Sequence, residues 1–322
     1  MKLKMRLYLY LDVAVIISIF VIIFYLYSIK QISQKEQLYS ELSTTENLFY
    51  NNNELVVAVV ACGDRLNETL TLIKSALMFS KGYLNFIVIA EDKLKENLNE
   101  KDVLPDVDAL LYMDTDTLFL TPVESIWRYF NKFNASQMAA LAPEHEDPAI
   151  AWYNRFAKHP YYGKLGVNSG VMLMNLTRMR LFKWTEYVVP IYKKYKLHIT
   201  WGDQDIINII FHYHPGKLFI YSCRYNYRPD HCMYSSICKA AEKNGVAVIH
   251  GSRGFFHSEK QPIFKEIYNV FYSFQLGSDI YRDFYQPVEA HLDTLENTNC
   301  GKLKNVFLKN IRRYLDLDFD NT

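Results

Sequence analysis

The sequence lacks an excess of charge of either sign. Its 322 residues contain 36 Lys and Arg against 35 Asp and Glu, a formal net charge of +1, and no basic stripe stands out. Binding to a phosphate backbone needs clustered Lys and Arg, so nucleic acid is not expected as a partner. The sequence also has no second cluster of carboxylates beside the one described below, which disfavours a two-metal phosphohydrolase.

Cysteine is also sparse, with five residues in the chain. An oxidising compartment would allow them to pair. Cys232 and Cys238 are close enough in sequence to bridge a short loop, whereas Cys62 lies in an apolar strand and is predicted to be a buried free thiol. The spacing leaves the remaining pairing open, including that of Cys223 and Cys300.

One long apolar run lies at the N-terminus. Residues 7–29 are almost wholly apolar, which is long enough for a helix to cross a bilayer. Lys2, Lys4 and Arg6 precede it, so residues 1–6 are predicted to stay cytosolic and the rest to be lumenal. A cleaved signal peptide is the competing interpretation, but no small-x-small cleavage site follows the run. We therefore predict a single-pass type II protein of the endoplasmic reticulum or Golgi membrane.

The chain after this anchor divides into a stem and a domain. Residues 30–54 are polar and rich in Gln, Ser, Glu and Asn, as expected of a stem. Residues 55–322 then form the predicted lumenal domain. Asn-x-Ser/Thr triplets at Asn67, Asn134 and Asn175 fit a lumenal address.

The domain begins with a strand, a helix and a strand. Residues 55–62 (LVVAVVAC) and 85–91 (NFIVIAE) are predicted to be buried strands, and the apolar spacing of residues 66–79 is helical. This order opens a nucleotide-binding α/β fold with a sheet flanked by helices. No third strand is visible between residues 90 and 110. Later strands are predicted at 110–113, 138–142, 218–222 and 246–250.

Helices are predicted among and after these strands. The pattern indicates helices at 122–130, at 181–195 with a break at Pro190, at 206–211 and in two segments after residue 262. Residues 152–164 are dense in aromatic and basic side chains without a regular period. We interpret them as a functional surface loop.

Two carboxylates follow the apolar strand at 110–113. Asp114 and Asp116 sit at its carboxyl end, the edge where open α/β sheets bind ligands. Carboxylates two residues apart supply hard oxygen ligands for Mg²⁺ or Mn²⁺ that carries substrate phosphates. The alternative is an Asp-rich turn with no ligand.

Other strand and helix ends carry polar residues that could complete such a site. His250 ends the strand VAVIH, and Asn168-Ser169 form a predicted turn just before an apolar strand. Mn²⁺ accepts mixed oxygen and nitrogen ligands, so two carboxylates and one imidazole suit it. Asp203 and Gln204 begin a short buried helix. The alternatives are a strand-end histidine bonded to backbone, and a helix N-cap with an incidental Gln.

The order of these motifs resembles a known family. VVAVVAC, VDALLYMDTDTLFL, GVNSGVMLMN, WGDQDIIN and VIHGSRG, in this order, resemble the retaining glycosyltransferases of family 8. Within that family, the runs LAPEHEDP, WYNRFAKHPYYGKLGVNSGVMLMN, KKYKLHITWGDQD and YNYRPDHC resemble the glucoside xylosyltransferases. The resemblance implies a GT-A type, Rossmann-like mixed sheet flanked by helices.

The resemblance also implies a reaction. The donor would be UDP-xylose, and the acceptor glucose O-linked to Ser of epidermal-growth-factor-like (EGF-like) repeats, as on Notch, joined by an α-1,3 bond. The leading mechanism is a same-face attack in which the departing phosphate takes the acceptor proton. The minority mechanism is a double displacement that uses Gln204 or a nearby carboxylate.

By the same resemblance, residues of this chain receive roles. Asp114, Asp116 and His250 would hold Mn²⁺ on the UDP diphosphate, and Arg253 or Lys260 would replace a family lysine beyond the histidine. Ala61, Cys62 and Arg65 would contact the uridine end of the donor. Asn168, Ser169 and Gly251 would contact the donor sugar and diphosphate. Asp203 would bind sugar hydroxyls, and Gln204 would lie beneath the anomeric carbon.

The sequence departs from these relatives in one place. They carry an additional strand and a helix with an Arg-Leu-x-Leu-Pro-like run before the Asp-x-Asp strand, where this chain has only LKENLNEKDVLPDVD. Without that segment, the donor pocket would lose one of its walls and the positively charged arginine of that run. The alternative hypothesis is therefore a catalytically impaired, membrane-anchored isoform that binds glycoprotein acceptors or partner transferases through residues 152–162.

Overall fold

The computed structural model describes residues 54–90 and 104–316, together with Lys30. The predicted cytosolic end, transmembrane helix and most of the stem lie outside these residues. None of the helices in the described ranges combines the length and the apolar character needed to cross a bilayer.

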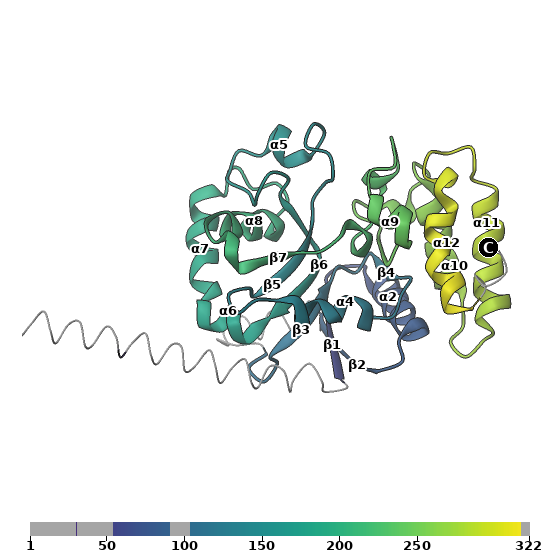
Figure 1. The fold of residues 1–322 in the computed structure, drawn as a ribbon, viewed down its shortest axis with the longest axis horizontal. Coiled ribbons are helices and arrows are strands. Elements are labelled where there is room, and N and C mark those ends of the chain that lie inside the picture. Colours follow the sequence, from purple (N-terminus) through teal and green to yellow (C-terminus); the bar gives the residue numbers. More distant parts are fainter. Residues whose placement is uncertain (1–29, 31–53, 91–103, 317–322) are drawn as a thin grey trace, which may run out of the picture. The chain divides into compact units, whose positions relative to one another are not determined.

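A mixed six-stranded sheet forms the centre of the domain (Figure 1). Its strand order is β2-β1-β3-β6-β5-β7, with β1 parallel to β2 and β3, and β6 antiparallel to β3 and β5. A second sheet pairs β4 with β8. The predicted α/β mixed sheet is confirmed. The strands are β1 (Glu54–Ala61), β2 (Tyr83–Ala90), β3 (Ala109–Met113), β4 (Thr117–Phe119), β5 (Ala139–Pro143), β6 (Val167–Asn175), β7 (Leu218–Ile220) and β8 (Val248–His250).

Helices cover the sheet on both sides, which explains the near-continuous apolar runs of its inner strands. The α-helices are α2 (Leu66–Phe79), α4 (Glu124–Trp127), α5 (Trp152–Phe156), α6 (Leu176–Phe182), α7 (Trp184–Tyr195), α8 (Asp203–Tyr213), α9 (Lys239–Asn244), α10 (Pro262–Ser273), α11 (Gln286–Asp293) and α12 (Lys304–Tyr314). Short 3-10 turns are η1 (Arg128–Lys132), η2 (Pro215–Lys217), η3 (Cys223–Tyr225), η4 (Pro229–His231), η5 (Phe255–His257) and η7 (Gly301–Leu303), and η6 (Tyr281–Tyr285) is a π-helical turn.

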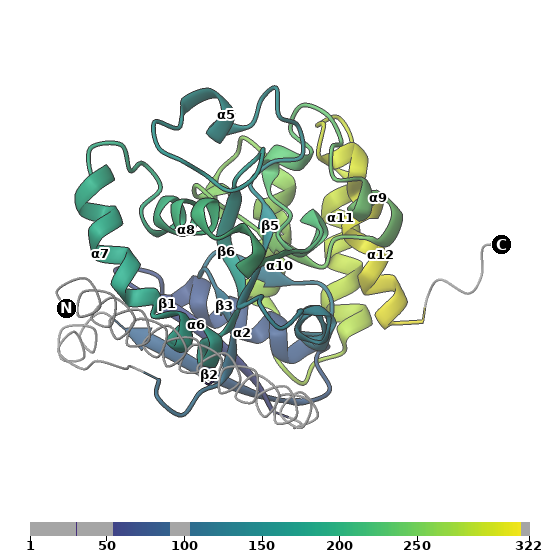
Figure 2. The same cartoon turned by 60° about the vertical axis from the view of Figure 1, so that its left-hand side comes forward.

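Two groups of side chains build the core. On one side of the sheet, Phe211 of α8 packs with Met172 of β6 and Leu141 of β5. On the other, Phe79 of α2 makes edge contacts with Phe271 of α10 and other rings of the C-terminal helices. These helices, α10 to α12, lie side by side in both views (Figures 1 and 2).

Three local predictions are wrong. The break in the helix predicted at 181–195 falls at Lys183, whose φ of 60° separates α6 from α7, and α7 continues through Pro190. The predicted loop 152–164 begins with the short helix α5. Asn168 and Ser169 lie within β6 rather than in a turn before it, because a bulge between Ala140 and Ala142 of β5 lets the pairing extend past them.

Three predictions about modifiable side chains also need correction. The disulfides join Cys223 of η3 to Cys238 before α9, and Cys232 after η4 to Cys300 before η7, so Cys232 and Cys238 do not pair with each other. Cys62 is free, as predicted, but exposed, because β1 ends at Ala61. Asn67 and Asn134 are exposed. Asn175 is buried and its side chain caps α6, so the folded domain does not present it for glycosylation.

The sheet topology brings distant segments together at one edge. Because β6 runs antiparallel to β3, its first residues lie beside the carboxyl end of β3, where the Asp114 N–H donates to the Gly170 carbonyl at 2.8 Å. The pairing of β4 with β8 sets Thr117 opposite His250. Figure 2 shows α5 and its flanking loops above the edge of β5 and β6.

Candidate active site

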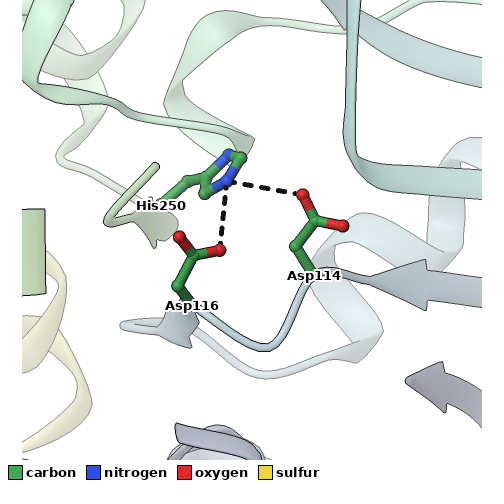
Figure 3. A group of neighbouring side chains, drawn as sticks. All are labelled: Asp114, Asp116 and His250. Atoms are coloured by element: carbon green, nitrogen blue, oxygen red, sulfur yellow. Dashed lines mark ion pairs between the residues drawn. The ribbon is translucent and has the colours of Figure 1, made fainter. Parts of the chain in front are cut away.

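Asp114, Asp116 and His250 converge at this edge, as predicted (Figure 3). His250 Nε2 lies 3.6 Å from Asp114 Oδ2 and 3.4 Å from Asp116 Oδ1. One ligand atom from each of the three side chains lies within 4.8 Å of the others. Two carboxylates and one imidazole form a donor set that suits a divalent cation with mixed oxygen and nitrogen ligands.

Gly170 leaves the space that this cluster occupies. A Cβ atom at residue 170 would lie 2.2 Å from His250 Cε1 and 2.8 Å from Asp114 Oδ2. The backbone of Gly170 is ordinary strand, so glycine is needed here for space and not for its conformational freedom. The strand therefore provides a cradle for the imidazole and one carboxylate.

A chain of hydrogen bonds fixes the tautomer of His250. The Gly170 N–H donates to Asn168 Oδ1, which identifies this atom as the oxygen of the Asn168 amide. Because an oxygen can only accept, the Asn226 atom 2.7 Å from it is the donor Nδ2. Asn226 then presents Oδ1 to His250 Nδ1, 2.8 Å away, and that nitrogen must be the donor. Nε2 is therefore the ring nitrogen that faces the two carboxylates, and in the neutral ring its lone pair would be available to a cation held between them.

The two carboxylates differ in their electrostatics. Burial raises the pKa of Asp114 above its ordinary value, despite the opposing effect of His250. Burial also acts on Asp116, but His250 and Arg65 outweigh it, so the pKa of Asp116 lies below its ordinary value. Tyr112 donates to Asp114 Oδ1 at 2.9 Å. The cluster is thus an acidic pair that a cation would stabilise.

A second network continues from Asn168 into α8. Gln204 Oε1 accepts from Asn168 Nδ2 at 2.8 Å and from the Ser169 N–H at 3.2 Å, and Gln204 Nε2 donates to the Tyr153 hydroxyl. That hydroxyl donates to Asp205 Oδ1 at 2.8 Å. Gln204 is therefore held at both ends of its amide.

A cavity of about 220 Å³ opens over these residues. It brings together eight of the predicted site residues: Asp114, Asp116, Asn168, Ser169, Asp203, Gln204, His250 and Arg253. Asp203 opens into it, and partial desolvation with the nearby Asp114 carboxylate raises the pKa of Asp203. The alternative roles of these residues as unrelated turn, cap and strand-end residues are therefore disfavoured.

The other predicted residues lie near the cavity without lining it. Ala61 is half-buried, Cys62 and Arg65 are exposed after β1, and the Gly251 N–H donates to the Asp116 carbonyl at 2.8 Å. The guanidinium of Arg65 is paired with Glu68, which Thr115 Oγ1 also approaches at 3.4 Å. Arg65 is thus tied to the loop that carries both aspartates.

The sequence interpretation missed several lining residues. Glu144, Trp152, Trp201, Arg228 and Ser252 also line the cavity. Glu144 and Trp152 further line an adjoining cavity of about 880 Å³. Glu144, Trp152 and Arg228 lie in runs that resemble the glucoside xylosyltransferases, but their residue types alone assign no role to each side chain.

Comparisons with known proteins agree with this geometry. The family described as Glycosyl transferase family 8 matches residues 98–252, the segment that contains all three cluster residues. Glucoside xylosyltransferase 1 of Gallus gallus is 43% identical over 310 residues, covering 80% of this chain and 72% of the relative. The chain belongs to glycosyltransferase family 8. Within the family it groups with the glucoside xylosyltransferases, and glucoside xylosyltransferase 2 of Xenopus laevis is likewise 43% identical over 319 residues, covering 82% of this chain and 75% of that relative.

The fold of this family 8 glycosyltransferase has solved counterparts. Galactosyltransferase LgtC, solved in complex with donor and acceptor sugar analogs, superimposes with a TM-score of 0.51 at 17% identity, over 71% of this chain and 99% of that one. At this identity the likeness shows the fold alone, a GT-A type mixed sheet flanked by helices.

Proposed function

We propose that this glycosyltransferase is a retaining α-1,3-xylosyltransferase that moves xylose from UDP-xylose to glucose O-linked to EGF-like repeats of the Notch type, with Mn²⁺ as its cation. The observation that carries the proposal is the cluster of Asp114, Asp116 and His250 at the rim of a cavity that also contains Asp203 and Gln204. The similarity to glucoside xylosyltransferases supports the donor and the acceptor.

The residues of the cluster have a clear part in this reaction. A bound Mn²⁺ would neutralise the charge that develops on the departing diphosphate. Asp114, Asp116 and His250 Nε2 would hold it. Asp203, the carboxylate open to the cavity, accepts hydrogen bonds from sugar hydroxyls. Asn168 and Ser169 position Gln204 beside the sugar through the bonds described above.

The bonding of Gln204 favours the same-face mechanism over a double displacement. Its carbonyl oxygen already accepts two hydrogen bonds, and its amide nitrogen donates to Tyr153. An amide oxygen engaged in this way is a weak nucleophile. The proton of the attacking hydroxyl then goes to the departing phosphate oxygen as the new glycosidic bond forms on the same face.

We further propose that residues 7–29 anchor the protein as a single-pass type II protein of the endoplasmic reticulum or Golgi membrane. The apolar run and the three basic residues before it support this topology. The two disulfides of the described domain fit an oxidising lumen.

The alternative function is a catalytically impaired isoform that binds glycoprotein acceptors or partner transferases. A specific observation favours it. The alignment with the Gallus gallus relative spans 310 residues, whereas 80% of this 322-residue chain is about 258 residues, so roughly 50 residues of the relative have no counterpart here. A difference in length is what the proposed loss of a donor-pocket segment between β2 and β3 predicts.

Two measurements on the full chain, purified in detergent, test these functions. With Mn²⁺ and UDP-xylose, the enzyme should add xylose to a glucosylated EGF-like repeat, and Asp116→Ala should abolish the transfer. Calorimetry with UDP and Mn²⁺ then separates the alternatives. Binding without transfer supports the impaired isoform, and a folded protein that neither binds nor transfers contradicts the enzyme.

A further inference from the structure

Glu68 is a buried acid to which the proposed reaction gives no part. It is the third residue of α2 and is only 4% exposed. The dipole of a helix favours an acid in its first turn, but that interaction is available at the surface and does not require burial. A buried carboxylate needs partners inside the protein, because an unpaired buried charge is costly. The partners of Glu68 therefore indicate what it does.

Side chains from three segments meet at this carboxylate. Arg65, which follows β1, donates from Nη1 to Glu68 Oε2 at 2.5 Å. Thr115 Oγ1 donates to the same oxygen at 3.4 Å, and His257 Nε2, at the end of η5, donates to Oε1 at 2.9 Å. Both carboxylate oxygens are thus in use. Glu68 joins the segments that follow β1, β3 and β8.

Two of these segments carry the metal cluster. Thr115 stands between the two aspartates drawn in Figure 3. The Gly251 N–H, beside His250, donates to the Asp116 carbonyl at 2.8 Å. The same two segments therefore meet twice, once through the backbone at Gly251 and once through the carboxylate of Glu68. The loop between the aspartates is held from outside the cavity, which Glu68 does not line.

The third segment brings a positive charge toward the cluster. Burial raises the pKa of Asp116, but His250 and Arg65 outweigh burial, so the guanidinium of Arg65 lies within electrostatic reach of the cation site. The side chain of Arg65 is 47% exposed, and its bond to Glu68 fixes a long side chain before any ligand binds. Such ordering reduces the entropy that binding an anionic ligand would cost.

A purely structural role is the alternative, and Ser75 provides an example of one. Ser75 lies two turns further along α2 on the same side of the helix and is fully buried. Its Oγ accepts from the Phe119 N–H of β4 at 3.0 Å. That strand is also held by its pairing with β8. Loss of the Ser75 bond should therefore lower stability without displacing the metal cluster.

We propose that Glu68 is a positioning residue of the donor site, which holds the loop between the two aspartates and the guanidinium of Arg65 where a divalent cation and a nucleoside diphosphate bind. This assignment rests on the proposed function, in which the donor is a nucleotide sugar held through a cation. Glu68 acts through Thr115 and Arg65 and does not itself bind the donor.

The test compares Glu68→Gln with Ser75→Ala in the full chain. Glutamine keeps the size of glutamate, but its amide nitrogen replaces one acceptor and so faces a donor of Arg65 or His257. Calorimetry measures the binding of Mn²⁺ alone and of UDP with Mn²⁺. We expect Glu68→Gln to bind each about tenfold more weakly, the lower end of what the loss of an outer partner costs. Ser75→Ala should stay within about twofold of the parent.

A third variant asks whether Glu68 acts on the cation through the loop. Thr115→Val keeps the shape of the side chain but removes the hydroxyl that reaches Glu68. It should weaken the binding of Mn²⁺, and the double variant with Glu68→Gln should lose less affinity than the sum of the two single losses. Additive losses overturn the proposal. Denaturant unfolding shows which variants fold, and if Glu68→Gln does not fold, unchanged Mn²⁺ binding by Thr115→Val overturns it.

The remaining outcomes separate the positioning role from the transfer reaction. Equal Mn²⁺ binding by the parent and Glu68→Gln overturns the role, as does an equal loss in Ser75→Ala or a parent that does not bind Mn²⁺. A parent that binds Mn²⁺ but neither binds UDP nor transfers xylose overturns the proposed function. In that case, weaker Mn²⁺ binding by Glu68→Gln still supports the hold of Glu68 on the metal loop.

Discussion

The two halves of the proposed donor site differ in how completely this chain builds them. Around the metal cluster, the hydrogen bonds run unbroken from His250 through Asn226 and Asn168 into α8 and end at Asp205. The half formed by β1, α2 and β2, where the uridine was expected, carries exposed apolar side chains instead: Leu66, Leu70, Leu77, Tyr83 and Val88.

This contrast indicates which part of the site depends on the proposed missing segment. β2 is an edge strand of the six-stranded sheet, yet its sequence is as apolar as that of a strand covered on both faces. The metal cluster draws on β3, β4, β6 and β8, none of which borders that edge. Among the described residues, the side chains at the metal and sugar end are thus joined by hydrogen bonds, whereas the end formed by β1, α2 and β2 exposes apolar side chains.

The largest expected effect is at Gly170. Gly170→Ala should remove cation binding in the presence of UDP, because the new Cβ atom takes the space of the His250 ring. Gly216→Ala is the matched control, since a Cβ atom there meets nothing within 4 Å. Calorimetry with Mn²⁺ and UDP checks both variants. Unchanged binding by a folded Gly170→Ala protein would show that the cluster does not hold the cation.

Asn226 should matter next. Asn226→Ala removes the acceptor that orients His250, and loss of such an outer partner lowers metal affinity by about 10- to 100-fold. Asn154→Ala, at an exposed position on α5, should leave the affinity unchanged. If both variants titrate with Mn²⁺ like the parent, the hydrogen-bond chain does not set the geometry of the site.

The far end of the network should show a smaller effect that depends on pH. Burial lowers the pKa of His159, but the ion pair of its Nε2 with Asp205 Oδ1 at 3.4 Å and the bond of its Nδ1 to the Pro160 carbonyl outweigh burial and raise the pKa. Burial raises the pKa of Asp205, but His159 and the backbone N–H groups of Trp201 and Thr200 outweigh burial. The pKa of Asp205 therefore lies below its ordinary value. His159 contributes its full stability below about pH 6.5, and this contribution is lost as the pH rises through the pKa of His159 in the folded protein. Asp205 contributes its stability above about pH 4.

His159→Gln should therefore cost more stability at pH 5.5 than at pH 8.5. Denaturant unfolding of the parent and the variant at both pH values measures the difference. His198→Gln, at an exposed site, serves as the control. A cost that is the same at both pH values would show that the pair is not charged in the folded protein.

Sequence patterns predicted much of the fold and the ligand atoms of the metal site. Strand-length apolar runs located β1 and β3, and the end of β3 placed Asp114 and Asp116 at the sheet edge. The spacing of residues 66–79 gave α2 to the residue. These features are local, so a short window of sequence contains the physical cause.

Features that depend on distant segments were not predictable in this way. Asn226 acquires its role only because it lies between Asn168 and His250 in space. Arg228 and Glu144 meet across 84 positions of sequence. The disulfide partners depend likewise on which segments pack together, and residue spacing within one loop does not encode that.

The smallest expected effect concerns the bare face of α2, and it sharpens the contrast between the two halves. Leu70 is 52% exposed, whereas Leu72, two residues further along α2, is fully buried. Leu70→Gln should change the free energy of unfolding by no more than about 0.5 kcal/mol. Leu72→Ala should cost about 2–5 kcal/mol, because it opens a cavity in the core. Denaturant unfolding measures both. With the segment that we propose is lost inserted between β2 and β3, Leu70→Gln should become destabilising and UDP should bind more tightly than to the present chain. A cost for Leu70→Gln in the present chain as large as that for Leu72→Ala would mean that this face is already covered, and the contrast between the two halves would be lost.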